Sequence, residues 1–196
     1  MQEAESESID EVQYLLKTRA IYLYGDIDEE SVLKFTAQLH FLEFSSSDPI
    51  TVFLNSGGGS TKDGYGLVDL LRQSPCHITI KVFGGACSIA AAILQGADRR
   101  EMSENSEFMI HNGSVMAGEL KTNDVEDLVG QTLKENHRYH QILATRSGQK
   151  IEQIAAWCKG DKYMDAEEAV ANGFADTVIK STKTFAKKPR KYTKRK

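Results

Sequence analysis

The sequence predicts one α/β domain, in which strands and helices alternate along the chain. Two apolar, β-branched runs, at 50–54 and 77–83, predict buried strands. Between and after them lie segments whose apolar residues recur at helical spacing. This alternation is typical of right-handed crossover units with parallel strands.

The N-terminal part is expected to form a short helix at 9–16 and a strand at 19–24, which Gly25 ends. Apolar residues then recur every three or four positions over 29–44, which predicts an amphipathic helix. A polar loop leads into the strand at 50–54.

The next helix is predicted at 62–73, because Ser60 and Asp63 have the spacing of an N-terminal cap and Pro75 ends the pattern. The strand at 77–83 follows, with Gly84 and Gly85 predicting a tight turn. Small residues then predict a helix at 89–96, and a strand follows at 107–110.

The longest predicted helix runs from Asn123 to Ser147 and is closed by Gly148. Its apolar stripe, which includes Val125 and Val129, is too long for so small a body to cover. We therefore expect the stripe to pack against another subunit. A helix at 151–157, one from Asp165 to Asn172 and a strand at 174–179 complete the expected order.

Composition favours a soluble protein of a reducing compartment, which we expect to be the cytoplasm. The three cysteines, at 76, 87 and 158, have neither disulfide-framework nor metal-ligand spacing. The acidic start of the chain lacks the apolar core of a signal peptide, and no apolar run is long enough to span a membrane.

Charge is divided unevenly along the chain. Residues 180–196 hold nine basic residues and no acidic one, while the rest of the chain holds 15 basic and 28 acidic residues. A body this acidic does not have the composition of a nucleic-acid-binding domain. We expect the basic tail to be disordered, and any contact with nucleic acid to be confined to it.

Three candidate site residues each lie just past a predicted strand: Gly59, Ser88 and His111. Because the carboxyl ends of parallel strands meet at one edge of a sheet, we expect them to lie together. Ser88 also precedes a helix, whose unpaired first amides can stabilise an oxyanion. The alternative is that Ser88 only caps that helix.

Four blocks, in this order, carry a resemblance to a known family: 55–60 (NSGGGS), 84–92 (GGACSIAAA), 109–113 (MIHNG) and 160–169 (GDKYMDAEEA). Together they resemble the ClpP family, the proteolytic subunits of the ATP-dependent Clp protease. The resemblance runs from about Leu15 to Ile179. The chain departs from the family pattern at three places, so it resembles a divergent member. The family has proline where this chain has Gly57, Gln-Pro where it has Asn112 and Gly113, and arginine where it has Gly160.

The resemblance implies serine-peptidase chemistry. It places the nucleophile on Ser88, the general base on His111 and the orienting acid on Asp161. It places the oxyanion-hole amides on Gly59 and Ile89.

The same resemblance implies that the substrate binds as an added strand along Gly58, Gly59, Asn112 and Gly113. The substrate would be an unfolded or extended polypeptide. The chain itself would need no cofactor or metal.

The resemblance also implies an overall organisation. The fold would be a crotonase/ClpP-like spiral of β–α units at 19–179, with a protruding handle at about 114–147. An acidic segment and short helix (1–18) would precede this domain, and the basic tail (180–196) would follow it. The chain would form a homo-oligomer, a heptameric ring or double ring, with an AAA+ unfoldase as the partner that uses ATP.

Four alternatives remain open. The chain could be a catalytically weak ring subunit, or a dedicated processing protease that acts without an ATPase. It could be an acyl-CoA enzyme of the crotonase superfamily, which would use a glutamate. Finally, Cys87 could be the nucleophile in place of Ser88.

Overall fold

The computed structural model describes residues 11–113 and 122–182. Within them, the strands are β1 Ala20–Ile27, β2 Ile50–Gly59, β3 Ile78–Cys87, β4 Arg99–Ser103, β5 Glu107–Ile110, β6 Lys162–Asp165 and β7 Thr177–Ile179. The helices are α1 Glu11–Thr18, α2 Glu29–Ser45, α3 Thr61–Gln73, α4 Ile89–Leu94, α5 Thr122–Ser147, α6 Ile151–Trp157 and α7 Ala166–Ala171.

The strands form one sheet in the order β1-β2-β3-β4-β7, and all of these pairs are parallel. β3 has two neighbours on the same side. Its residues 79–82 pair with β4, and its residues 85–87 pair with β5. β6 then pairs antiparallel with β5. The predicted α/β architecture of β–α units is therefore confirmed.

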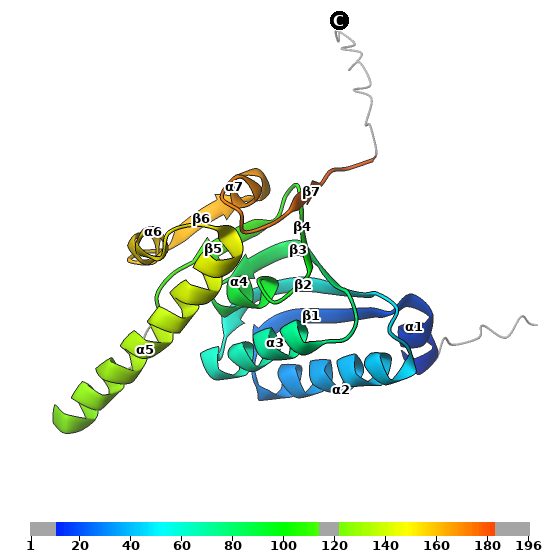
Figure 1. The fold of residues 1–196 in the computed structure, drawn as a ribbon, viewed down its shortest axis with the longest axis horizontal. Helices are drawn as coiled ribbons and strands as arrows, with labels where there is room; N and C mark the ends of the chain where they lie inside the picture. The colour runs from blue at the N-terminus through cyan, green and yellow to red at the C-terminus, as the bar shows by residue number, and fades with distance from the viewer. Residues whose placement is uncertain (1–10, 114–121, 183–196) are drawn as a thin grey trace, which may run out of the picture.

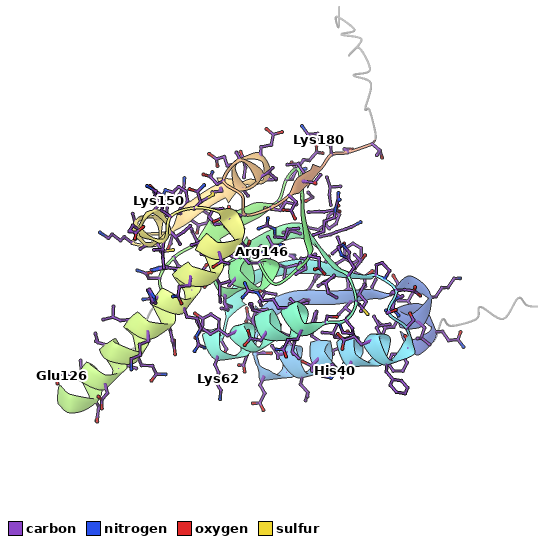
Figure 2. The ribbon with its side chains drawn as sticks, in the orientation of Figure 1. His40, Lys62, Glu126, Arg146, Lys150 and Lys180 are labelled. Carbon is purple, nitrogen blue, oxygen red and sulfur yellow. The ribbon has the colours of Figure 1, made fainter. Side chains whose placement is uncertain are left out.

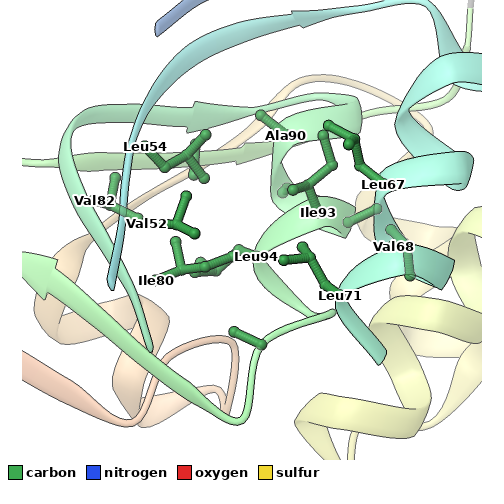
Figure 3. Packing of buried hydrophobic residues seen from close by; sticks show 14 of the residues in the cluster. Val52, Leu54, Leu67, Val68, Leu71, Ile80, Val82, Ala90, Ile93 and Leu94 are labelled. Carbon is green, nitrogen blue, oxygen red and sulfur yellow. The ribbon is translucent and has the colours of Figure 1, made fainter. Parts of the chain in front are cut away.

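Helices α2, α3 and α4 lie along one side of the sheet, and the N-terminal end of α5 projects from the body (Figure 1). The core forms where α3 and α4 meet the inward side chains of β2 and β3; it includes Val52, Leu54, Leu67, Leu71, Ile80 and Ile93 (Figure 3). α3 approaches α4 closely at Gly64, where an added Cβ would lie 3.1 Å from Ile89 Cδ1. This contact fixes the helix that begins directly after Ser88.

Caps and helix ends follow the sequence prediction. Ser60 Oγ accepts from the amide of Asp63, and Asp165 forms a capping box with Glu168 at the start of α7. Gly148 follows α5 with φ +74°, a conformation suited to glycine.

Two strands were not predicted. β4 (Arg-Arg-Glu-Met-Ser) is mostly charged or polar, and β6 has four residues, so neither has the apolar run that indicates a strand. β4 is accommodated because the guanidinium of Arg100 is buried against Asp176 and the carbonyl of Gly173. The predicted turn at Gly84 and Gly85 was wrong, because β3 continues through both glycines to Cys87.

Residues 1–10 of the predicted N-terminal segment, 114–121 of the predicted handle and 183–196 of the predicted basic tail lie outside the described residues. Among the described helices, none combines the length and the apolar character needed to span a membrane.

Candidate active site

Ser88 occupies the junction between β3 and α4 in a strained conformation. Its φ of 55° and ψ of −127° lie in a region that side-chain-bearing residues rarely adopt. Its side chain makes no capping hydrogen bond, so the alternative that it only caps α4 is wrong. Its amide donates to Met109 O at 2.9 Å, and its carbonyl accepts from Ala91 N at 3.0 Å. These bonds hold the backbone so that the hydroxyl is free to face the site.

His111 lies beside this hydroxyl because β5 runs parallel to the end of β3. Cys87 is paired with Met109, so the residues just past both strands are neighbours. His111 Nε2 lies 2.9 Å from Ser88 Oγ.

Asp161 lies beside His111 because it precedes β6, a strand that runs antiparallel to β5. β6 runs antiparallel to β5 and pairs Lys162 with Ile110, so the residue before β6 lies next to the residue after β5. Asp161 Oδ1 is 3.3 Å from His111 Nδ1, and the aspartate side chain is 58% exposed. The structure thus brings Ser88, His111 and Asp161 together. His111 contacts the serine hydroxyl through one ring nitrogen and the aspartate through the other, so the imidazole is placed to take the hydroxyl proton.

The glycine segment lies against the serine. Gly58 has φ +109°, and a Cβ there would lie 2.6 Å from Ser88 Cβ and 3.2 Å from its Oγ. Gly59 has φ +147°, and a Cβ there would lie 2.8 Å from the backbone nitrogen of Ile27. Both positions therefore require glycine for contacts within the chain, irrespective of substrate. At Gly57 an added Cβ would meet nothing within 4 Å.

The two predicted oxyanion-hole amides belong to different segments, Gly59 to the end of β2 and Ile89 to the start of α4. Ile89 is the first residue of α4, and the first amides of a helix have no acceptor within it. The amide of Gly58 donates to Ser56 Oγ at 3.0 Å and is already engaged. The amide of Gly59 is the candidate from this segment.

Asn112 and Gly113 are held mainly by other parts of the chain. The amide of Asn112 donates to Cys158 O at 2.9 Å, and its side-chain oxygen accepts from His140 Nε2 at 2.8 Å. The amide of Gly113 donates to Asn136 Oδ1 at 2.8 Å. Their predicted contact with substrate remains a prediction, and their observed contacts fix the segment that follows His111.

Sequence reasoning missed the part that α5 plays in the site. His140 of this helix is only 8% exposed, and burial, with His137 nearby, lowers its pKa. Tyr139 is also buried, and its hydroxyl donates to Ser88 O at 2.9 Å. The available signal was the placement of Asn136 and His140, two polar residues, in the apolar stripe of the predicted helix.

A narrow cleft opens beside Ser88 and is lined mainly by α3 and α5, through Thr61, Tyr65, Glu135 and Tyr139. Tyr65 donates to Glu135 O at 2.9 Å, and Thr61 Oγ1 lies 3.3 Å from Glu135 Oε2. The wall of the cleft is therefore partly polar and includes a carboxylate.

Cys87 is poorly suited to act as a nucleophile. Burial, together with the nearby Glu107 carboxylate, raises the pKa of its thiol to about 11. The thiol faces Glu107 Oε1 at 3.8 Å. Within the described ranges, no group of three His, Cys, Asp or Glu side chains has the arrangement of a metal site.

Comparisons with known proteins agree with this fold. A family model described as Clp protease matches residues 2–182. The ATP-dependent Clp protease proteolytic subunit of Leuconostoc citreum is 32% identical over 180 residues, which cover 88% of each chain. The subunit of the same description from Streptococcus suis is 33% identical over 183 residues, covering 90% of this chain and 92% of the relative.

A solved structure described as the ClpP1 N165D mutant from Listeria monocytogenes has the same architecture. It superposes with a TM-score of 0.80 at 26% identity, over 87% of this chain and 96% of that one.

Proposed function

Because this chain belongs to the Clp protease family, we propose that it is a serine endopeptidase that cleaves extended or unfolded polypeptides inside an oligomeric chamber. One observation carries the proposal: the 2.9 Å contact between Ser88 Oγ and His111 Nε2, with Asp161 on the other ring nitrogen. That arrangement is what a weakly nucleophilic hydroxyl needs for attack on an amide.

In the proposed reaction, Ser88 Oγ attacks the scissile carbonyl carbon while His111 Nε2 takes the hydroxyl proton. The imidazolium then gives this proton to the leaving amine, and an acyl-enzyme remains on Ser88. His111 then takes a proton from water, which attacks the acyl carbonyl carbon; the bond to Ser88 Oγ breaks, His111 returns the proton to Oγ, and the acid product leaves. Asp161 would accept a hydrogen bond from the Nδ1–H group of His111, which fixes the tautomer and stabilises the imidazolium while the proton stays on the ring.

The negative charge on the tetrahedral intermediate would be stabilised by the amides of Gly59 and Ile89. The Ile89 amide has the added field of the first turn of α4. The substrate would lie as an extended strand past Gly58. Binding of this kind uses hydrogen bonds to the substrate backbone more than contacts with its side chains. Broad specificity is the expected consequence.

Oligomer formation is supported by an exposed apolar stripe on α5. Val125, Val129 and Leu133 are 39%, 52% and 64% exposed and lie four residues apart on the projecting half of the helix. A stripe of this kind on a projecting helix favours packing against another subunit. We propose that it joins copies of this chain in a ring or double ring, and that a Clp ATPase delivers substrate to the chamber.

The domain division proposed with this function is one peptidase domain at 19–179, between the segment 1–18 and the basic tail 180–196. No resident cofactor is proposed.

The test is labelling of the full-length protein with a fluorophosphonate probe, read by intact mass and compared with Ser88→Ala. We expect one adduct on the wild type and none on the variant. Absence of an adduct on the assembled wild type would contradict the proposal and favour a catalytically weak ring subunit. Binding of an acyl-CoA by the unlabelled protein would instead favour a crotonase-type enzyme.

A further inference from the structure

One face of α5 contacts both segments that carry the proposed nucleophile and base. Asn136, Tyr139 and His140 share this face, because residues three and four apart are neighbours on a helix. Each of the three makes a hydrogen bond to residue 88, 112 or 113. The helix therefore bridges the end of β3 and the end of β5.

Tyr139 acts on the nucleophile segment. Its side chain is 5% exposed, and its hydroxyl donates to Ser88 O at 2.9 Å. Burial raises the pKa of this phenol well above its ordinary value, so it remains a hydrogen-bond donor at every working pH. Ser88 O also accepts from Ala91 N, so the carbonyl would keep one partner if the Tyr139 hydroxyl were removed. The second bond is thus not needed to satisfy the carbonyl.

The hydrogen bond from Tyr139 holds Ser88 in its strained backbone conformation. Ser88 has a positive φ, and relaxation toward ordinary helical angles would move both its carbonyl and its hydroxyl. A donor fixed in the core and aimed at this carbonyl opposes such a rotation. Tyr139 is therefore placed to keep Ser88 Oγ directed at His111.

Asn136 and His140 act on the base segment. Asn136 Oδ1 accepts from Gly113 N at 2.8 Å. His140 Nε2 is 2.8 Å from Asn112 Oδ1, and an amide oxygen only accepts, so His140 carries a proton on this nitrogen. These two bonds hold the two residues that directly follow His111.

We propose that Tyr139 is a positioning residue that, with Asn136 and His140, fixes the distance between Ser88 Oγ and His111 Nε2. Without α5, the two segments are tied to each other near the site by the Ser88 N to Met109 O bond at the end of the β3–β5 ladder. The inference rests on the proposed function, because positioning has meaning only if Ser88 reacts.

The first test compares full-length wild type, Tyr139→Phe and Thr145→Val in hydrolysis of a fluorogenic peptide across pH. Thr145→Val is the matched control, since it also removes a hydroxyl that donates to a backbone carbonyl on α5, at Gln141 O. For Tyr139→Phe we expect kcat to fall roughly 10-fold with KM unchanged, since small misplacement of reacting groups costs rate more than binding. The shape of the pH profile and the unfolding temperature should match those of the control.

A kcat for Tyr139→Phe equal to that of Thr145→Val would overturn the inference. So would a fall in kcat that is accompanied by a matching fall in unfolding temperature or loss of the oligomer, because that pattern indicates a purely structural role.

The second test uses Asn136, measured on the high-pH plateau of the profile. Asn136→Asp keeps an oxygen that can accept from Gly113 N, whereas Asn136→Leu removes it. We expect the aspartate variant to keep most of the wild-type kcat and the leucine variant to lose roughly 10-fold. Equal activity of the two variants would contradict positioning by this bond.

Probe labelling separates this inference from the function on which it rests. If the wild type is labelled and Tyr139→Phe is labelled at the same rate, only the positioning role fails. If the assembled wild type is not labelled at all, both the function and the positioning role fail.

Discussion

The amide of Ser88 donates to the carbonyl of Met109, two residues before His111. This bond continues the parallel ladder between β3 and β5 by one step past Cys87, so the register of the sheet determines where the proposed nucleophile and base meet. Ser88 and His111, which are 23 residues apart in sequence, are neighbours because β3 and β5 end side by side at the same edge of the sheet.

Asp161→Asn should lower kcat by about 10²- to 10⁴-fold, because the amide can present its NH₂ group to His111 and favour the wrong tautomer. KM should change little, since Asp161 touches the imidazole and not the cleft. Steady-state kinetics of the full-length protein measure both constants. An unchanged kcat would remove Asp161 from the proposed mechanism.

Gly58→Ala should slow probe labelling by at least about 10-fold, since the new methyl group would lie 2.6 Å from Ser88 Cβ and the residue has a positive φ. Gly57→Ala is the matched control, because its methyl group would enter open space and its φ is not positive. The labelling rates of the two variants show whether the contact between Gly58 and Ser88 matters for reactivity. Equal rates would show that the contact between Gly58 and Ser88 does not govern reactivity.

Cys87→Ala should retain activity and fluorophosphonate labelling. Burial and the Glu107 carboxylate raise the pKa of the thiol to about 11, so the thiolate is scarce at neutral pH and alkylation should be slow. Iodoacetamide treatment at pH 7.5, followed by intact mass and an activity assay, checks this expectation. Rapid inactivation of the wild type that Cys87→Ala abolishes would reopen the cysteine alternative.

Asp176→Asn should reduce stability at neutral pH by about 2 kcal/mol, because it weakens the contacts of the buried Arg100 guanidinium. Partial burial alone would raise the pKa of Asp176, but its hydrogen bonds from Arg100 outweigh this and hold the pKa below its usual value.

The pH dependence of that effect has a definite sign. A depressed folded-state pKa gives stability that is complete above about pH 4 and is lost as the pH falls through the folded value. The difference between wild type and Asp176→Asn should therefore shrink in acid. Urea unfolding at pH 7 and at pH 3 measures it, and a constant difference would contradict the assignment.

Leu133→Lys should weaken subunit association, because it places a charge in the exposed apolar stripe of α5. Asp127→Lys is the control: Asp127 is exposed and lies two positions from both Val125 and Val129, so it faces away from the stripe on the projecting end of the helix, which Figure 2 marks with Glu126. Sedimentation velocity should show smaller species for the first variant only. If both variants sediment like the wild type, the stripe does not join subunits.

The order of elements was largely predictable from the sequence, because apolar periodicity marks most of the strands and helices that form the core. α6 at Ile151–Trp157 and β5 at Glu107–Ile110 begin and end where the pattern predicted. β4 was not predictable in this way. Its buried side chains include Arg100, whose burial depends on a carboxylate 76 residues away in sequence, and no local pattern reports such a pairing.

The meeting of Ser88 and His111 could be anticipated, because both follow parallel strands. The position of Asp161 could be assigned only by resemblance, since it depends on the antiparallel strand β6, whose four residues have no distinctive pattern. The α5 contacts to residues 88, 112 and 113 could not be predicted either. A helical stripe reports which residues face inward, but not which backbone groups they meet.

The late position of β6 in the sequence has a consequence for when the site can form during synthesis. The chain emerges from the ribosome N-terminus first, so β1 to β5 are available to fold before α5, α6 and β6 exist. A nascent chain that ends before residue 122 contains Ser88 and His111, but neither the helix face that holds them nor Asp161. If the proposed mechanism holds, peptidase competence therefore arises late in synthesis, only after α5 and β6 have joined the sheet.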